Sequence, residues 1–185
     1  MTESTTTAHE TGWLTRPTLS TERLVLRAPA ARDREPLIAL AGSPDVSRWL
    51  SRVPHPYTAA DADYFLADAA DATIWAIADA GSDALMGTIA LHPLDLADEP
   101  GSAEIGYWLG MPYWGNGYGL EAVRRIVDHA FAHPGVPAVR ARYAGANAPS
   151  ARILAKVGFT PVTAPMIVGG PGGSMCDTEV VLYRP

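Results

Sequence analysis

Residues 102–132 read SAEIGYWLGMPYWGNGYGLEAVRRIVDHAFA, and the order of polar, apolar and glycine residues in this stretch decides the fold. The first nine residues alternate, so that one face carries Ala103, Ile105, Tyr107 and Leu109 and the other Glu104, Gly106 and Trp108. This alternation is typical of a strand, which we expect at the centre of a sheet. Residues 120–131 place apolar side chains at helical spacing until His133-Pro134-Gly135 ends the helix. Strand, loop and helix together predict half of a βαβ unit.

The loop between this strand and this helix, Trp114-Gly115-Asn116-Gly117-Tyr118-Gly119, has three glycines within five residues. Glycine lets the backbone approach a ligand and adopt a positive φ, and the helix start presents unpaired N–H groups and a positive dipole end. These properties favour a pyrophosphate, although the loop taken alone fits an ordinary glycine-rich turn equally well. It is not a dinucleotide fingerprint, which follows the first strand, and no Gly-Lys-Ser/Thr follows as in a Walker loop.

The rest of the chain alternates strand and helix patterns around this unit. Residues 33–50 predict two short helices, because Gly42-Ser43-Pro44 interrupts the apolar spacing. A helix over residues 59–70 follows the capping residue Thr58 and has its buried side formed by Tyr64, Phe65 and Leu66. A further helix is expected over residues 147–157, and strands over 19–27, 73–78, 85–91, 136–143, 159–162 and 178–183. The glycine-rich residues 166–177 predict a mobile connection.

Length and composition set the class of protein. A chain of 185 residues has the length of one domain, which we expect over residues 18–185 after a flexible, polar lead-in over residues 1–17. The formal net charge of −6 argues against a nucleic-acid partner. Cys176 is the only cysteine, and the histidines lack partners at ligand spacing, so we expect no disulfide and no metal site. Without a leader pattern or an apolar run of ~20 residues, we expect a cytoplasmic protein and no membrane partner.

Four segments of the chain resemble, in order and spacing, the GNAT superfamily of N-acetyltransferases and within it the branch of the ribosomal-protein N-terminal acetyltransferases. They are TERLVLR (21–27), AEIGYWL (103–109), YWGNGYGLEA (113–122) and NAPSARILAKVGF (147–159). The resemblance covers residues 19–183. It implies an α/β fold, a single domain with a mixed, largely antiparallel sheet, a splayed central strand pair and flanking helices. The family's R/Q-x-x-G-x-G/A motif would be Trp114-x-x-Gly117-x-Gly119, where tryptophan departs from the usual arginine or glutamine.

The resemblance also implies the donor, acetyl-CoA, and the residues that hold it. Its pyrophosphate would be bound by the backbone N–H groups of Gly115, Asn116, Gly117, Tyr118, Gly119 and Leu120. Its pantetheine arm would pair with the strand end formed by Leu109, Gly110 and Met111, and with Asn147.

Two catalytic residues are implied in the same way. Ser150 matches a serine near the thioester sulfur, where a hydroxyl can protonate the departing thiolate. Glu104 matches the branch's candidate general base, which would take a proton from the attacking amine. Taken alone, Asn147 and Ser150 favour helix capping over a functional role, and Glu104 also fits a solvated strand carboxylate. Many superfamily members place a tyrosine acid five residues before the phenylalanine of the Gly-Phe pair, but here that position is Leu154.

The sequence thus predicts an acetyl-CoA-dependent N-acetyltransferase whose acceptor is a primary amine, either a protein N-terminus or a small molecule. A CoA-binding module without turnover, acting as a sensor or partner domain, is the alternative from another class. Both candidate proton-transfer residues, Glu104 and Ser150, argue for the enzyme. Homodimer formation stays open at this point.

Overall fold

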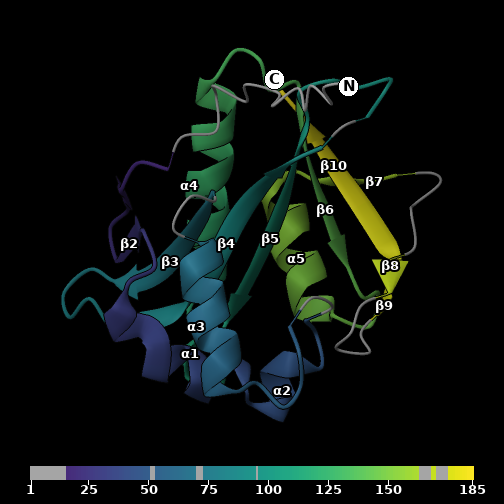
Figure 1. Ribbon diagram of the computed structural model, residues 1–185. Helices are drawn as coiled ribbons and strands as arrows, with labels where there is room; N and C mark the ends of the chain where they lie inside the picture. Colours follow the sequence, from purple (N-terminus) through teal and green to yellow (C-terminus); the bar gives the residue numbers. More distant parts are fainter. Residues whose placement is uncertain (1–15, 51–52, 70–72, 95, 163–167, 170–174) are drawn as a thin grey trace, which may run out of the picture.

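An eight-stranded sheet forms the framework of the protein in a computed structural model that describes residues 16–50, 53–69, 73–94, 96–162, 168–169 and 175–185 (Figure 1). The strand order is β1-β2-β3-β4-β5-β6-β10-β7. Every neighbouring pair is antiparallel except β5 and β6, which run parallel. The strands are β1 (Leu19–Ser20), β2 (Leu24–Arg27), β3 (Ile74–Asp79), β4 (Leu85–Pro93), β5 (Ala103–Leu109), β6 (Ala138–Tyr143), β7 (Thr160–Pro161) and β10 (Thr178–Tyr183).

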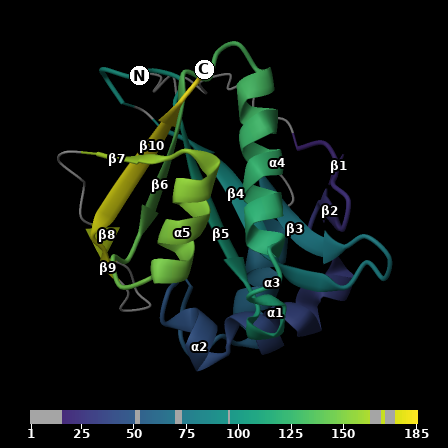
Figure 2. The same cartoon turned by 180° about the vertical axis from the view of Figure 1, so that it is seen from behind.

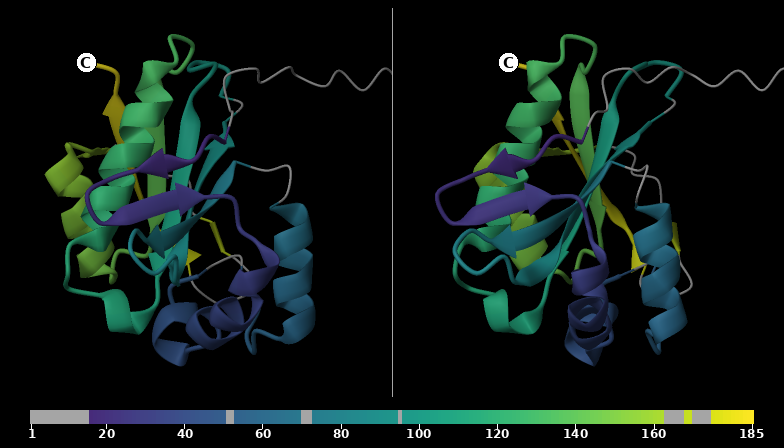
Figure 3. Two further views of the ribbon diagram at one scale, coloured as in Figure 1. Left: turned by 90° about the vertical axis from the view of Figure 1, so that its left-hand side faces the viewer. Right: turned by 60° about the vertical axis from the view of Figure 1, so that its left-hand side comes forward.

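Helices cover both faces of the sheet. One face carries α4 (Tyr118–Ala132) and α5 (Ala148–Val157), which lie in front of the strands in Figure 2. The opposite face carries α1 (Arg34–Ala41) and α3 (Ala59–Asp68), and both views of Figure 3 show the two helical layers separated by the sheet. The short helix α2 (Pro44–Ser47) and the 3-10 turns η1 (Ala31–Asp33) and η2 (Met111–Tyr113) complete the described helical elements. This mixed, largely antiparallel sheet flanked by helices is the expected fold.

The alternation of β5 determines which residues face each layer. Ile105 and Leu109 belong to the large core beneath α4 and α5, together with Val123, Ile126 and Leu154. Trp108, on the other face, packs against the smaller core that includes Leu37, Ala62, Ala76 and Leu85. The single strand β5 thus contributes to both hydrophobic cores, as the alternating pattern of residues 102–110 predicts.

The central strands β5 and β6 separate after a short paired segment. Their pairing consists of Ala103 with Val139 and Glu104 with Arg140. Beyond this point the two strands diverge toward the lower end of the sheet in Figure 1, and α5 is visible through the gap. The splayed central strand pair is therefore confirmed.

Local signals place most helix ends correctly. Thr58 caps α3, since its hydroxyl accepts from the N–H of Asp61 while the Asp61 carboxylate accepts from the N–H of Thr58. The break at Gly42 and Ser43 separates α1 from α2 as expected. The prediction that Tyr64 lies on the buried side of α3 is wrong, since the residue is 75% exposed. The fully buried residue of α3 is Ala62, whose small side chain lets the helix approach the core.

The two ends of the chain differ in part from the prediction. Residues 19–27 form two strands, because a turn at residues 21–23 folds β1 back on β2. Residues 1–15 of the expected lead-in lie outside the described residues, whereas the Pro17 carbonyl already accepts a hydrogen bond from the Trp75 indole at 2.8 Å. Most of the connection 166–177 also lies outside the described residues. Within it, β8 (Val168–Gly169) pairs with β9 (Met175–Cys176).

A polar cluster ties the β1–β2 turn to the first turn of α4. Glu121 of α4 accepts hydrogen bonds from the backbone N–H and the guanidinium of Arg23 and from the hydroxyl of Thr21. The Arg23 guanidinium also donates to the Asn116 carbonyl and lies 4.5 Å above the Tyr118 ring. Although burial opposes ionisation, the hydrogen bonds from Thr21 and Arg23 together hold the pKa of Glu121 below its usual range. This cluster fixes the glycine loop against the sheet edge.

Replacing Glu121 by glutamine should lower stability at pH 7 by about 2 kcal/mol, the scale for hydrogen bonds to a charged group. Since the pKa of Glu121 is lower in the folded protein, its contribution is complete above the unfolded pKa of about 4.3 and disappears as pH falls through the folded value. The stability difference between wild type and Glu121→Gln, measured by urea unfolding, should therefore shrink toward pH 3. Glu35→Gln, at an exposed ion pair with Arg34, is the control and should change stability by less than about 0.5 kcal/mol.

Candidate active site

Two cavities open on opposite faces of the sheet and meet at the gap between β5 and β6. The first has a volume of about 390 Å³ and is bounded by α5, by the start of α4 and by the segment after α2. The second, of about 650 Å³, is bounded by α3 and by side chains of β3 and β4. The residues that line both are Trp49, Leu50, Ile105, Gly106, Tyr107, Trp108 and Arg142. The two cavities therefore adjoin each other at this part of the sheet.

The glycine loop lies between β5 and the N-terminus of α4, and Trp114 and Gly119 at its two ends line the first cavity. Gly115 and Gly117 have φ values of 78° and 83°, a conformation that favours glycine. Gly117 is the N-cap of α4 and has no side chain with which to satisfy the first N–H groups of the helix. A Cβ added at Gly115 would meet nothing within 4 Å. The loop thus offers unobstructed backbone and a helix N-terminus, which is the arrangement that binds phosphate groups.

Gly119 has a different structural reason to be glycine. It lies inside the first turn of α4, where an added Cβ would come 3.0 Å from the Cδ1 atom of Ile153 on α5. Its missing side chain lets α4 and α5 pack closely beside the loop. Tyr118, the first residue of α4, contributes its ring to the contact with Arg23.

The backbone N–H and C=O groups of β5 point alternately toward its two neighbouring strands, β4 and β6. The bonds from Leu94 N–H to the Ser102 carbonyl and from Gly110 N–H to the Met86 carbonyl show that the even-numbered residues pair with β4. The N–H and C=O groups of the odd-numbered residues are therefore directed toward β6, and those of Tyr107 and Leu109 lie beyond the paired segment. Trp114 confirms this direction, because its indole donates to the Leu109 carbonyl at 2.7 Å.

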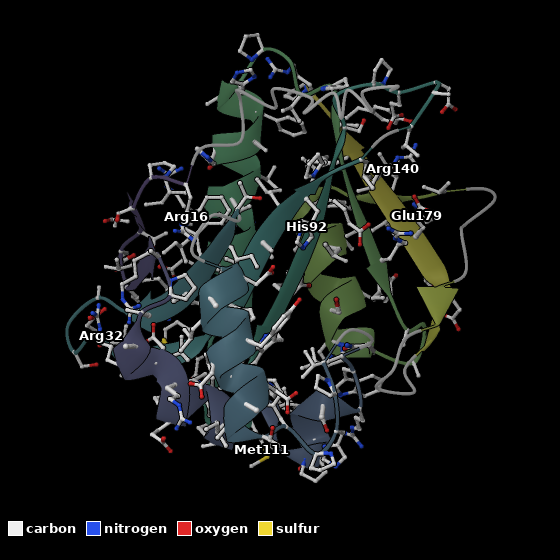
Figure 4. The ribbon with its side chains drawn as sticks, in the orientation of Figure 1. Arg16, Arg32, His92, Met111, Arg140 and Glu179 are labelled. Carbon is white, nitrogen blue, oxygen red and sulfur yellow. The ribbon has the colours of Figure 1, made fainter. Side chains whose placement is uncertain are left out.

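Leu109, Gly110 and Met111, the residues expected to pair with the pantetheine arm, differ in how their groups are placed. Leu109 borders the first cavity and directs backbone groups into the gap. Gly110 uses its N–H for the bond to Met86, and its carbonyl accepts from Tyr113. Met111 begins the η2 turn, has a 51% exposed side chain and lies at the lower end of the sheet in Figure 4.

Asn147 and Ser150 meet at the start of α5, on the wall of the first cavity. The Asn147 side chain caps the helix by accepting from the Ser150 N–H at 3.2 Å. The Ser150 hydroxyl does not take part in this cap but lies 3.0 Å from the Tyr107 hydroxyl of β5. Burial raises the pKa of Tyr107 to about 12, against the opposing effect of the Ser150 hydrogen bond. Tyr107 therefore stays protonated at neutral pH, and the two hydroxyls form a neutral pair that can share a proton.

Glu104 lines the second cavity and forms an ion pair with Arg142 of β6. Their side chains are only 14% and 13% exposed, so Glu104 is not the solvated carboxylate that the residue type alone allows. His92 of β4 is the cross-strand partner of Glu104 and lines the same cavity. In Figure 4, His92 lies on one side of the gap, and Arg140 with its partner Glu179 lies on the other.

Sequence reasoning did not find Tyr107, Arg142 or His92 as parts of this site. Tyr107 belongs to the apolar row of β5, and only the position of α5 brings Ser150 to its hydroxyl. Arg142 is 38 residues from Glu104 in the chain, and the parallel register of β5 and β6 brings the two together. His92 could be placed beside Glu104 only from the register between β4 and β5. The alternation of β5 alone could have indicated that Tyr107 faces the layer of α4 and α5.

Comparisons with known proteins agree with this geometry. A family model described as an acetyltransferase (GNAT) domain matches residues 23–160. The uncharacterized N-acetyltransferase p20 of Bacillus licheniformis is 30% identical over 147 residues, which are 77% of this chain and 82% of that protein. The chain therefore belongs to the GNAT acetyltransferase family.

Solved structures show the same fold at lower sequence identity. The GNAT-family acetyltransferase from Bacillus anthracis has a TM-score of 0.78 at 19% identity, and the match covers 91% of this chain and 99% of that one. The aminoglycoside acetyltransferase AAC(6')-Ib, solved in complex with coenzyme A, has a TM-score of 0.66 at 20% identity, with 86% and 94% covered. Within the described part of this chain, no group of three or more His, Cys, Asp or Glu residues could hold a metal ion. No described helix is long and apolar enough to cross a membrane.

The two residues at the start of α5 should differ in their effect on stability. Asn147→Ala removes the cap and should lower the free energy of unfolding by about 1 kcal/mol. Ser150→Ala keeps the backbone N–H that receives the cap but removes the hydrogen bond to the Tyr107 hydroxyl, so it should cost less than about 0.5 kcal/mol in a Tyr107→Phe background, where that bond is already absent. Chemical denaturation of Asn147→Ala and of Ser150→Ala, each in that background, measures the difference. An equal loss in both would mean that the Ser150 hydroxyl stabilises the helix as much as the cap does.

Proposed function

We propose that this protein transfers the acetyl group of acetyl-CoA to a primary amine by direct attack of the amine on the thioester. The observation that carries the proposal is the meeting of two cavities at the β5–β6 gap. One cavity ends at a phosphate-type glycine loop and the other carries a carboxylate, so each of two substrates has its own side of the sheet. A module that binds only CoA has no need for the second cavity.

The first cavity suits the donor. Its length is bounded by the glycine loop at the start of α4 and by Ser150 near the gap. We assign the pyrophosphate to the backbone of residues 115–120 and the pantetheine arm to Leu109, Gly110, Met111 and Asn147. The complex of AAC(6')-Ib with coenzyme A supports this assignment, because that protein shares the fold and binds CoA.

The second cavity suits an amine. Its described walls combine the aromatic residues Trp49, Tyr57, Tyr64, Phe65 and Trp108 with the carboxylates of Asp61, Asp68 and Glu104. Aromatic faces and carboxylates both attract cations, and an amine arrives mainly as an ammonium ion at neutral pH. Both a protein N-terminus and a small amine such as an aminoglycoside meet this description.

Glu104 is the proposed proton acceptor. The amine can attack only as a free base, so one proton must leave it before or during attack. The Glu104 carboxylate already has a cationic partner in Arg142, and an arriving ammonium would compete for the same oxygens. We infer that Arg142 positions the carboxylate and balances its charge, while Glu104 accepts the proton directly or through water.

The Ser150–Tyr107 pair is the proposed proton donor on the other side. When the amine nitrogen bonds to the carbonyl carbon and the carbon–sulfur bond breaks, the electron pair stays on sulfur as a thiolate. The Ser150 hydroxyl can give its proton to that thiolate and take up the second proton that the amine nitrogen loses as the amide forms, while the Tyr107 hydroxyl, 3.0 Å away, donates a hydrogen bond to the Ser150 oxygen. This arrangement replaces the tyrosine acid of many relatives, whose position here is the buried Leu154.

Mass spectrometry of an amine panel incubated with acetyl-CoA tests turnover and acceptor class together. The panel should include peptides with free N-termini, polyamines and aminoglycosides, and at least one should gain an acetyl group. Ser150→Ala should lower kcat by ~10² while acetyl-CoA binding is kept, as expected for loss of a general acid. Acetyl-CoA binding without transfer to any member of the panel would favour the CoA-binding module.

Glu104→Gln should lower kcat by ~10² or more at pH 7, because the amide keeps the shape but cannot accept the proton. The remaining activity should rise with pH toward the acceptor's own pKa, since more of the amine is then neutral without help. Arg142→Gln is the matched control, because it breaks the same ion pair and keeps the carboxylate. If the two variants lost activity equally with the same pH profile, the ion pair and not proton transfer would be the function of Glu104.

A further inference from the structure

Gly106 stands in the middle of β5 without a structural need for glycine. Its φ is not among the positive values of the glycines in the described chain, so no turn or left-handed conformation requires it. Glycine in a strand interior weakens the strand, because it adds conformational entropy to the unfolded chain and has no side chain to pack. A glycine at this position therefore carries a cost that the fold itself does not explain.

Two nearby glycines, Gly87 and Gly110, are required by packing, because neighbouring atoms leave no room for a side chain. At Gly87 of β4, an added Cβ would lie 2.1 Å from the Trp108 carbonyl oxygen. At Gly110, after β5, it would lie 2.5 Å from the Cδ2 atom of Leu40. At Gly106, a Cβ would meet no atom within 4 Å. Packing thus excludes a side chain at the first two positions and leaves open space at the third.

The open space at Gly106 lies where the two cavities join. Gly106 is exposed and lines both the first and the second cavity. It shares its face of β5 with Glu104 and Trp108, two positions away on either side, so its missing side chain leaves a hollow between the proposed base and an aromatic wall. Tyr107, the next residue, faces the other way and holds the Ser150 hydroxyl.

We propose that the missing side chain of Gly106 makes the passage through which donor and acceptor meet, and that the size of residue 106 sets the largest group that can react there. The inference rests on the proposed function. The carbonyl carbon and the amine nitrogen must approach to about 3–3.5 Å for attack. A side chain at position 106 would occupy the space between Glu104 and Trp108 in which the substituents of both reacting atoms must fit.

The proposal can be tested with substitutions that the fold tolerates. Gly106→Ala and Gly106→Val add one and three carbons to open space in an extended strand, so both variants should fold with stability equal to or above wild type. Gly81→Ala is the matched control, because it adds the same methyl group at the turn between β3 and β4, where the nearest atom is 3.5 Å away. This control should leave every functional measurement unchanged.

The first measurement is calorimetric binding of CoA and of CoA thioethers with methyl, propyl and benzyl groups on sulfur. Wild type and Gly81→Ala should bind the whole series. Gly106→Val should bind CoA with wild-type affinity but lose about 10-fold or more with the larger thioethers, the scale for a methyl-sized misfit in a pocket, and Gly106→Ala should be intermediate. Equal affinities of all proteins across the series would overturn the proposal.

The second measurement compares transfer to an unbranched amine with transfer to an amine on a branched carbon. Gly106→Ala should lower kcat/KM for the branched acceptor about 10-fold more than for the unbranched one. An equal effect on both acceptors would overturn the proposal while leaving the transferase intact. A wild-type protein that binds the thioethers but transfers nothing would overturn the proposed function, and the thioether series would still decide the role of Gly106.

Discussion

The short pairing between β5 and β6 is the constraint on which the site depends. Only two residue pairs join these strands, at Ala103 and Glu104 of β5, before they diverge. A central strand normally satisfies its backbone groups on both sides. Here the backbone groups of Tyr107 and Leu109 lie beyond the paired segment, and the Leu109 carbonyl accepts from the Trp114 indole instead of from β6. The two cavities share lining residues where the strands diverge, so both depend on this one feature of the sheet.

The gap also determines how polar side chains can work in an otherwise apolar centre. Glu104 and Arg142 lie at its edge with side chains that are about one-seventh exposed, and each neutralises the other. Buried charges are stable only when they are paired, and the pair costs more to break than a surface one. On the opposite face, Tyr107 and Ser150 form a neutral pair. The sheet thus separates an ion pair on one face from a neutral pair of hydroxyls on the other.

Anchoring of the glycine loop links this chemistry to the sheet edge. Glu121 and Arg23 connect the first turn of α4 to the β1–β2 turn, and the Arg23 guanidinium reaches the backbone of Asn116. A loop with two glycines in the left-handed conformation would otherwise be free to move, because glycine adopts many conformations. Holding it in one conformation reduces the entropy that binding must overcome. Residues of the β1–β2 turn therefore help to hold the glycine loop in this conformation.

The sequence by itself determined the strand, loop and helix at residues 102–132, because alternation, glycine and helical spacing act between neighbours in the chain. It also determined the caps of α3 and α5, since Thr58 and Asn147 bond to N–H groups three residues away. The family resemblance supplied the splayed strand pair. Only the tertiary structure decided that Glu104 meets Arg142, that Ser150 meets Tyr107 and that Tyr64 is exposed. These contacts depend on strand register and helix docking, which join residues that no local pattern relates.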